Sequence, residues 1–230
     1  EAARLAQPPQ REPTLGLLAK TLLKQVPEIA RLRLSSIDSI EVDRHLLDLL
    51  ADEPRFMPHL HLSLQHGDDL ILKRMKRRHL SADALAFIAK ARELRPGIAF
   101  GADFIAGFPT ETETHFDNLV RFAEEADIAQ LHVFPYSPRP GTPAARMPQL
   151  DRAVVKDRAR LLRETGERLK ARHLAGMIGK RETVLTERGE NGHTENFAPV
   201  ATPGLEPGRF VMARITGHDG KRLIADFGPA

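Results

Sequence analysis

The chain has 230 residues, and its 34 lysines and arginines against 31 acidic residues give a formal net charge of only +3. It contains no cysteine, which excludes disulfide bonds and thiolate metal sites. No apolar run approaches the roughly 20 residues of a membrane-spanning helix, and the polar segment 1–11 lacks the pattern of a signal peptide. We therefore expect a cytoplasmic protein with no membrane partner. Its first residue is Glu1 rather than methionine, which favours a fragment or a processed form of a longer protein.

Strand-like and helix-like segments alternate between residues 14 and 150. Apolar runs and apolar–polar alternation predict strands at 31–36, 59–65, 98–106 and 130–136. Helical patterns predict helices at 14–24, 40–51, 81–94 and 113–125. This order is typical of βαβ units, whose right-handed crossovers build a parallel sheet that curls into an open or closed barrel. The expected fold class is therefore α/β.

One face of each predicted strand carries polar or small residues. These residues are Arg31, Arg33 and Ser35 on the first strand, His59, His61, Ser63 and Gln65 on the second, Gly101, Asp103, Ile105 and Gly107 on the third, and His132, Phe134 and Tyr136 on the fourth. A buried polar group without a partner costs roughly 1–3 kcal/mol, so four polar faces favour a ligand-lined barrel interior. An internal network, such as Arg33 with Asp103, is the alternative.

The third strand ends in a glycine-rich turn, Gly107-Phe108-Pro109. Thr110 and Glu113 have the spacing of a capping box for the next helix. Gly101 and Gly107 would let the backbone approach a flat ligand such as an adenine ring, at the strand ends where barrel enzymes place their chemistry. The proline-rich segment 133–145 is expected to form a rim over the barrel mouth.

A strongly basic segment follows the second strand. Asp68 or Asp69 can N-cap a helix, and residues 73–78 contain five basic side chains and no acid. A second basic helix is predicted at 150–174, with eight basic against four acidic residues over 151–172. Such clusters are typical of proteins that bind a polyanion such as RNA, although a solvated helix face has the same pattern.

Four blocks of sequence allow a family to be named: RLRLSSID (31–38), HLSLQHGDDLILKRMKRRH (61–79), GADFIAGFPTETETHF (101–116) and VFPYSPRPGTPAA (133–145). In this order they resemble the third to sixth barrel strands, with their loops, of the methylthiotransferases of the radical S-adenosylmethionine superfamily. The resemblance implies a partial (β/α) barrel of the radical SAM type. SSID, QHGDD and LKRMKRRH are most similar to the branch that acts on threonylcarbamoyladenosine beside the tRNA anticodon.

The resemblance also implies roles for individual residues. By motif position, Ser63 and Gln65 contact the ribose or methionine part of S-adenosylmethionine, Asp103, Ile105 and Gly107 line the cofactor, and Phe134 and Tyr136 flank the adenine. Arg33 and Ser35 share the polar face of the first strand and complete the expected cofactor-binding set. Lys73, Arg74 and Arg77 are expected to contact tRNA. No catalytic residue is assigned.

Residues 175–230 form a second predicted domain, after a first domain of residues 1–174. Short β-rich segments separated by glycines predict a small β-barrel of the oligonucleotide-binding type, and this part resembles the TRAM domain of tRNA-modifying enzymes. The candidate RNA contacts here are Arg181, Arg188, Lys221 and Arg222. Phe197 is either a stacking platform for a base or, more simply, part of the core.

The missing cysteines mark the limit of the resemblance. Enzymes of this family bind two 4Fe–4S clusters, and the one that activates S-adenosylmethionine is held by three cysteine thiolates. We therefore interpret the chain as a C-terminal portion that needs a missing N-terminal half, and we expect no activity from it alone. The main alternative is a non-catalytic module that binds the tRNA anticodon stem-loop. Others are a sister enzyme acting on isopentenyl-adenosine or on a ribosomal protein and, more distantly, an aldolase-like barrel, for which the polar faces offer no Schiff-base lysine.

Overall fold

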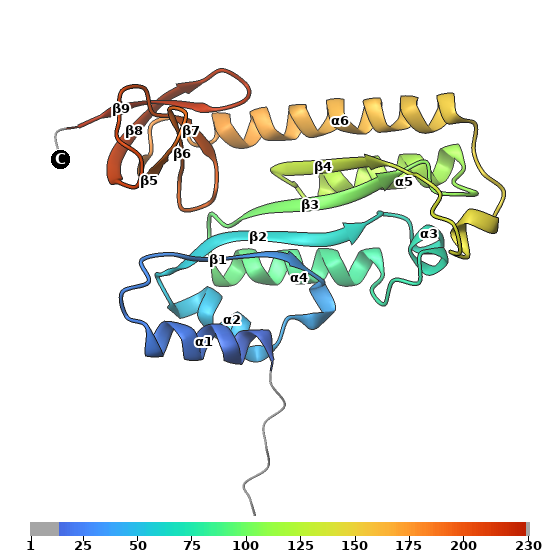
Figure 1. Cartoon of the computed structure of the whole chain (residues 1–230), viewed down its shortest axis with the longest axis horizontal. Helices are drawn as coiled ribbons and strands as arrows, with labels where there is room; N and C mark the ends of the chain where they lie inside the picture. Colours follow the sequence, from blue (N-terminus) through green and yellow to red (C-terminus); the bar gives the residue numbers. More distant parts are fainter. Residues whose placement is uncertain (1–13, 229–230) are drawn as a thin grey trace, which may run out of the picture.

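The computed structural model describes residues 14–228 and contains a four-stranded parallel sheet followed by a closed five-stranded barrel (Figure 1). The first part comprises α1 (Leu15–Gln25), β1 (Leu32–Ile37), the 3-10 helix η1 (Ser39–Glu41), α2 (Arg44–Asp52), β2 (Phe56–Gln65), α3 (Asp69–Arg74), α4 (Ser81–Leu94), β3 (Ala99–Ala106), α5 (Glu113–Glu125), β4 (Gln130–Pro135), the 3-10 helix η2 (Ala144–Arg146) and α6 (Arg152–Ala175). The barrel comprises β5 (Arg181–Glu187), β6 (Asn191–His193), β7 (Pro199–Ala201), β8 (Phe210–His218) and β9 (Leu223–Phe227).

The sheet order is β1-β2-β3-β4, and every neighbouring pair is parallel. Each strand therefore lies beside the next one along the chain, as expected for successive βαβ units. The predicted α/β fold with a partial barrel and a small C-terminal β-barrel is confirmed. Among residues 14–228, no helix has the length and apolar content needed to cross a membrane.

The apolar face of the sheet packs against the helices. Leu60, Leu62 and Leu64 of β2 are buried in one cluster with Phe100 and Phe104 of β3 and with apolar residues of the helices. Because side chains alternate along a strand, the same register turns the polar residues of these strands to the opposite face. This second face is the one on which a site can form.

Two helix starts differ from the sequence prediction. The predicted helix 40–51 is split into η1 and α2, because the Asp43 side chain accepts the N–H of Leu46 at 2.9 Å and so starts a new helix. The same carboxylate accepts the N–H of Gly16 at 3.1 Å, which ties α2 to α1. The N-cap of α5 is Thr112, which forms a capping box with His115, and not Thr110, whose φ is 68°.

The predicted basic helix after β2 is shorter than expected. Asp68 does cap it, accepting the N–H groups of Leu70 and Ile71, but α3 ends at Arg74. Lys76 has a φ of 58°, in the left-handed region, so the chain turns away there. Most of the basic residues that follow therefore lie on an irregular segment rather than on one helix face.

The C-terminal barrel lies at the amino ends of the parallel strands, away from their loop-bearing carboxyl ends (Figure 1). Arg31, just before β1, donates to the carbonyl of Thr183 at 2.8 Å. The guanidinium of Arg33 lies 3.8 Å from the ring centroid of Phe197, whose carbonyl accepts the side-chain amide of Gln130 at 2.9 Å. Contacts of Arg31, Arg33 and Gln130 thus help to hold the barrel against the sheet.

Candidate functional site

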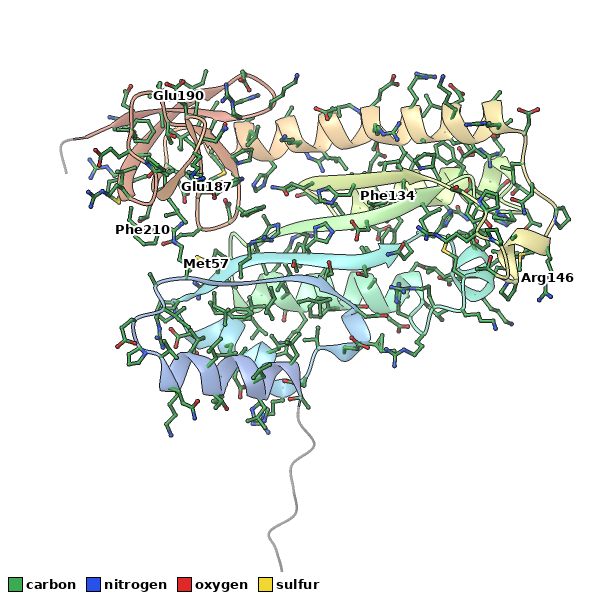
Figure 2. The ribbon with its side chains drawn as sticks, viewed as in Figure 1. Met57, Phe134, Arg146, Glu187, Glu190 and Phe210 are labelled. Carbon is green, nitrogen blue, oxygen red and sulfur yellow. The ribbon has the colours of Figure 1, made fainter. Side chains whose placement is uncertain are left out.

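Five of the nine predicted cofactor-binding residues line one cavity at the carboxyl ends of β2, β3 and β4: Gln65, Asp103, Ile105, Phe134 and Tyr136. Its volume is about 500 Å³, within the range of small-molecule sites. The segment after β4 supplies the rest of its wall, including Arg139 and Thr142. In Figure 2, Phe134 lies on β4 between the C-terminal barrel and the 3-10 helix η2, which carries Arg146.

The cavity contains one backbone conformation that is rare for its residue type. Gln65, the last residue of β2, has a φ of 68°, and the pairing of β2 with β3 is irregular between Leu62 and Gln65. A non-glycine residue in the left-handed region costs about 1–3 kcal/mol, and such residues are concentrated at functional sites. The strained residue here is one that lines the cavity.

Four predicted cofactor contacts lie elsewhere. Arg33 stacks on Phe197, and Ser35 is exposed on β1, so neither lines the cavity. Ser63 is half-buried, and its carbonyl accepts a hydrogen bond from Arg77. Gly107 lines a second cavity, of about 680 Å³, between the segment after β4 and the start of α6.

The two glycines make room for protein side chains. A Cβ atom at Gly107 would lie 2.7 Å from a methyl group of Val155, so this glycine lets α6 approach the turn after β3. At Gly101 the Cβ would lie 2.6 Å from Nδ1 of His61. The internal network that the sequence offered as an alternative, Arg33 with Asp103, does not form. Asp103 contacts His61 and His132 instead.

A buried carboxylate that the sequence reading did not assign holds the loops of the site together. Glu111 is 4% exposed, and its carboxylate accepts the N–H of Gly107. Its Oε1 atom lies 2.8 Å from Nη1 of Arg158 in α6, and its Oε2 lies 3.1 Å from Nε2 of His66. The loops after β2 and β3 and the helix α6 therefore meet at one side chain.

The hydrogen bonds of His66 show which of its two ring nitrogen atoms carries the proton. Its Nδ1 accepts the backbone N–H of Asp68 at 3.0 Å, so Nε2 carries the proton that is donated to Glu111. Because the ring is fully buried, both of its nitrogen atoms need a partner, and both have one. Local sequence does not predict this network, because His66, Glu111 and Arg158 are far apart along the chain.

The basic side chains predicted to contact RNA on the α3 segment differ in whether they already have a partner within the protein. Arg74 donates to the hydroxyl of Thr110 at 2.7 Å, and Arg77 is 3.6 Å from the Asp38 carboxylate, so both have partners within the protein. Lys73 is exposed and makes no ion pair with any residue of the described chain. Lys73 shares this exposure with Lys76, which also makes no ion pair with a described residue, whereas Arg78 pairs with Glu41.

The four basic residues predicted in the barrel are divided between two places. Arg222 donates to the side chain of Asn191 at 3.0 Å, which brings the β8–β9 turn with Lys221 beside the β5–β6 turn with Arg188. Arg181 instead pairs in register with Arg214 of β8. Phe197 is not an open stacking platform, because its ring is stacked on His193 at 4.2 Å and covered by Arg33.

Glu111 allows a matched test of the buried network. In Glu111→Gln the Arg158 cation loses its buried carboxylate, and we expect the free energy of unfolding to fall by about 3–5 kcal/mol. The control is Glu113→Gln, because Glu113 contacts the same arginine at 3.0 Å but is exposed, and its loss should cost less than about 1 kcal/mol. Urea denaturation measures both. Equal stability of the two variants would contradict a structural role for the buried carboxylate.

His59 predicts a pH dependence of stability. Its ring is 1% exposed with both nitrogen atoms unpaired among the described residues, and burial, followed by the nearby Arg33 charge, lowers its pKa from 6.5 to about 3. His61, His173 and His193 also face it and act in the same direction. Because the unfolded chain binds the proton more tightly, this contribution to stability is complete above about pH 6.5 and is lost as the pH falls toward 3.

We therefore expect His59→Asn to flatten the fall in unfolding free energy between pH 6 and pH 4 by up to about 1.4 kcal/mol per pH unit. Chemical denaturation at a series of pH values measures the slope. Carboxylates that titrate in the same range act in both proteins and cancel in the comparison. His218→Asn, at the end of β8, serves as the control and should keep the original slope. An unchanged slope in His59→Asn would show that His59 does not stay neutral.

Comparison with known proteins agrees with the geometry. The profile described as "Radical SAM superfamily" matches residues 8–123. Threonylcarbamoyladenosine tRNA methylthiotransferases from Rickettsia prowazekii and Thermotoga maritima are 50% and 34% identical, each over 89% of this chain and 49% and 48% of their own lengths. The tRNA-2-methylthio-N(6)-dimethylallyladenosine synthase of Neorickettsia sennetsu is 37% identical over 81% of this chain and 40% of its own length.

Among solved structures, coproporphyrinogen III oxidase (HemN) from Escherichia coli superposes with a TM-score of 0.54 over 90% of this chain and 55% of its own. Its 16% identity supports a shared fold only. The chain spans about half the length of the curated relatives it matches. The parallel sheet, its order of strands and the profile match together show that this chain belongs to the radical SAM superfamily, with tRNA methylthiotransferases among its relatives.

Proposed function

We propose that this chain is the C-terminal portion of an enzyme that adds a methylthio group to threonylcarbamoyladenosine in tRNA. The observation that carries the proposal is the convergence of Gln65, Asp103, Ile105, Phe134 and Tyr136 on one cavity at the carboxyl ends of parallel strands. Ligands of α/β folds bind at these strand ends. The 50% identity to an enzyme named for this reaction supports the choice of substrate.

The lining of the cavity fits the nucleoside part of S-adenosylmethionine. Phe134 and Tyr136 would flank the adenine ring, with Ile105 as a further apolar surface. Gln65 and Asp103 offer an amide and a carboxylate for ribose hydroxyls or the amino group. When bound, this cofactor supplies the methyl group and the radical chemistry. The residues of this chain would orient it, and the proline-rich segment after β4 would limit access of water.

The iron–sulfur clusters of the family do not fit the residues of this chain. The chain has no cysteine, and the imidazoles of His59 and His61 are poor replacements for the thiolates that such clusters require. We propose that both clusters are held by an N-terminal half outside this sequence, and we expect the isolated chain to be inactive.

Basic residues at the two ends of the molecule support tRNA as the partner. Lys73 lies near the carboxyl ends of the strands, and Arg188, Lys221 and Arg222 lie on the C-terminal barrel at the amino ends. Contacts at both ends would let one RNA span the sheet, with the anticodon stem-loop near the cavity. The cytoplasm, where tRNA is modified, is the corresponding location.

A second candidate substrate is dimethylallyladenosine in tRNA. It is favoured by the 37% identity to the Neorickettsia sennetsu synthase. The two candidates share the cofactor and the methylthio transfer and differ in the group on the adenosine nitrogen.

The natural reading frame that contains this chain can be expressed in a bacterium from which its own methylthiotransferases have been deleted. Mass spectrometry of the tRNA nucleosides should then show 2-methylthio-threonylcarbamoyladenosine. As a variant, Ile105→Asp places a charge in the apolar wall of the cavity and should reduce the product at least about tenfold, whereas the exposed Ile40→Asp should not.

Three other outcomes of the nucleoside analysis would contradict parts of the proposal. Only 2-methylthio-dimethylallyladenosine would support the second candidate and contradict the first. No methylthio nucleoside, from a protein that is expressed and folded, would contradict both and leave a non-catalytic tRNA-binding protein. Equal product from the two isoleucine variants would contradict the assigned cofactor cavity.

A further inference from the structure

Three metal-ligating side chains converge on the polar face of the sheet, one from each of β2, β3 and β4. His61 Nε2 lies 2.9 Å from Asp103 Oδ1, and His132 Nδ1 lies 3.3 Å from the same oxygen. The three ligand atoms all lie within 4.8 Å of one another. Asp103 also lines the proposed cofactor cavity, and His132 lines a hollow of about 370 Å³ together with His193 and Phe197 of the barrel.

The sheet itself holds the three side chains in place. Asp103 is directly opposite His132 in the β3–β4 pairing, and His61 is opposite Gly101 in the β2–β3 pairing. Gly101 does not have a left-handed φ, so glycine is needed there for space: a Cβ would lie 2.6 Å from the His61 ring. The two imidazole rings, with centroids 4.7 Å apart, are thus brought together by residues on rigid strands.

The donor atoms suit a first-row divalent metal, and the two spacings measured from Asp103, 2.9 and 3.3 Å, are close to those that such an ion requires. Bonds of about 2.0–2.2 Å from one ion to nitrogen and oxygen ligands place neighbouring donor atoms roughly 3.0–3.4 Å apart. Two imidazoles with one carboxylate suit Zn²⁺, Fe²⁺ or Co²⁺ and leave further coordination positions open. Mg²⁺ and Ca²⁺ prefer sites made of oxygen ligands, so they do not fit this set.

A neighbouring histidine supports a ligand at this face. His59, two residues before His61 on the same side of β2, is buried with no hydrogen-bond partner on either ring nitrogen within the described chain. Buried imidazole nitrogens normally have a partner. This part of the sheet therefore contains histidine nitrogen atoms that no hydrogen bond within the described residues satisfies.

We propose that His61, Asp103 and His132 bind one first-row divalent cation, with its open coordination positions beside the cavity lined by Asp103. This site differs from the iron–sulfur clusters of the family, because its ligands are imidazole and carboxylate and belong to this chain. It does not depend on the proposed methylthio transfer. An ion here would link the three strands and would present a positive charge to an anionic or carbonyl group bound in the cavity.

Titration of the metal-free 230-residue chain with Co²⁺ tests the site. We expect one bound ion per chain, detected by the visible absorption of Co²⁺ coordinated by nitrogen and oxygen and by calorimetry. His132→Asn and Asp103→Asn should each weaken binding by at least about tenfold. His115→Asn, at the start of α5 and outside the group, is the matched control and should bind as the unmodified chain does.

The variants also distinguish metal binding from a simple hydrogen-bonded group. Asparagine at position 132 can still donate a hydrogen bond to Asp103, so a purely hydrogen-bonded role would survive in His132→Asn. The side chain of His132 is 56% exposed, so circular dichroism should show the variant folded. Absence of Co²⁺ binding, or equal affinity in His132→Asn, Asp103→Asn and His115→Asn, would overturn the proposal.

Discussion

The buried carboxylate of Glu111 is the constraint on which the arrangement of the candidate site depends. A charge taken out of water is stable only when its partners surround it, and Glu111 draws its partners from three segments: Gly107 after β3, His66 after β2 and Arg158 in α6. The loops at the carboxyl ends of the strands cannot rearrange separately while these bonds hold. Two of these partners, His66 and Gly107, lie within two residues of Gln65 and Ile105, which line the neighbouring cavity.

The parallel sheet also has one polar face. Sheets of this kind are usually apolar on both faces because helices cover both, whereas here the helices pack on the leucine face. The polar face is divided along the strands. At the amino ends it is covered by the C-terminal barrel through Arg33 and Phe197, in the middle it carries His61, Asp103 and His132, and at the carboxyl ends it opens into the cavity.

Local patterns predicted much of the fold. The helices at 81–94 and 113–125 have the predicted bounds, and the four strands lie within a few residues of the expected ones, because periodicity and apolar content decide such elements. The helix predicted at 40–51 is split because Asp43 caps a new helix through the N–H of Leu46, and the same carboxylate also binds the N–H of Gly16 in another helix. Local sequence does not show a contact of that kind.

Prediction of the site was likewise limited by contacts between residues that are far apart in the sequence. Motif position identified five residues that share the cavity, and alternation placed Arg33 on the polar face of β1, where it contacts Phe197. Which group occupies that face depends on Phe197, which is far away in sequence. The role of Glu111 depends on Arg158, and in the sequence that arginine looks like one more charge on a basic helix. Buried ion pairs between distant segments need the folded chain to be seen.

The most direct test of the account is a nuclear magnetic resonance titration of the isotopically labelled chain with S-adenosylhomocysteine, the stable analogue of the proposed cofactor. The account predicts that the amide signals of Gln65, Ile105 and Phe134 shift together as the ligand is added, because these residues line one cavity. Shifts confined to residues 149–163, which border the larger cavity beside α6, or no shifts at all, would contradict it.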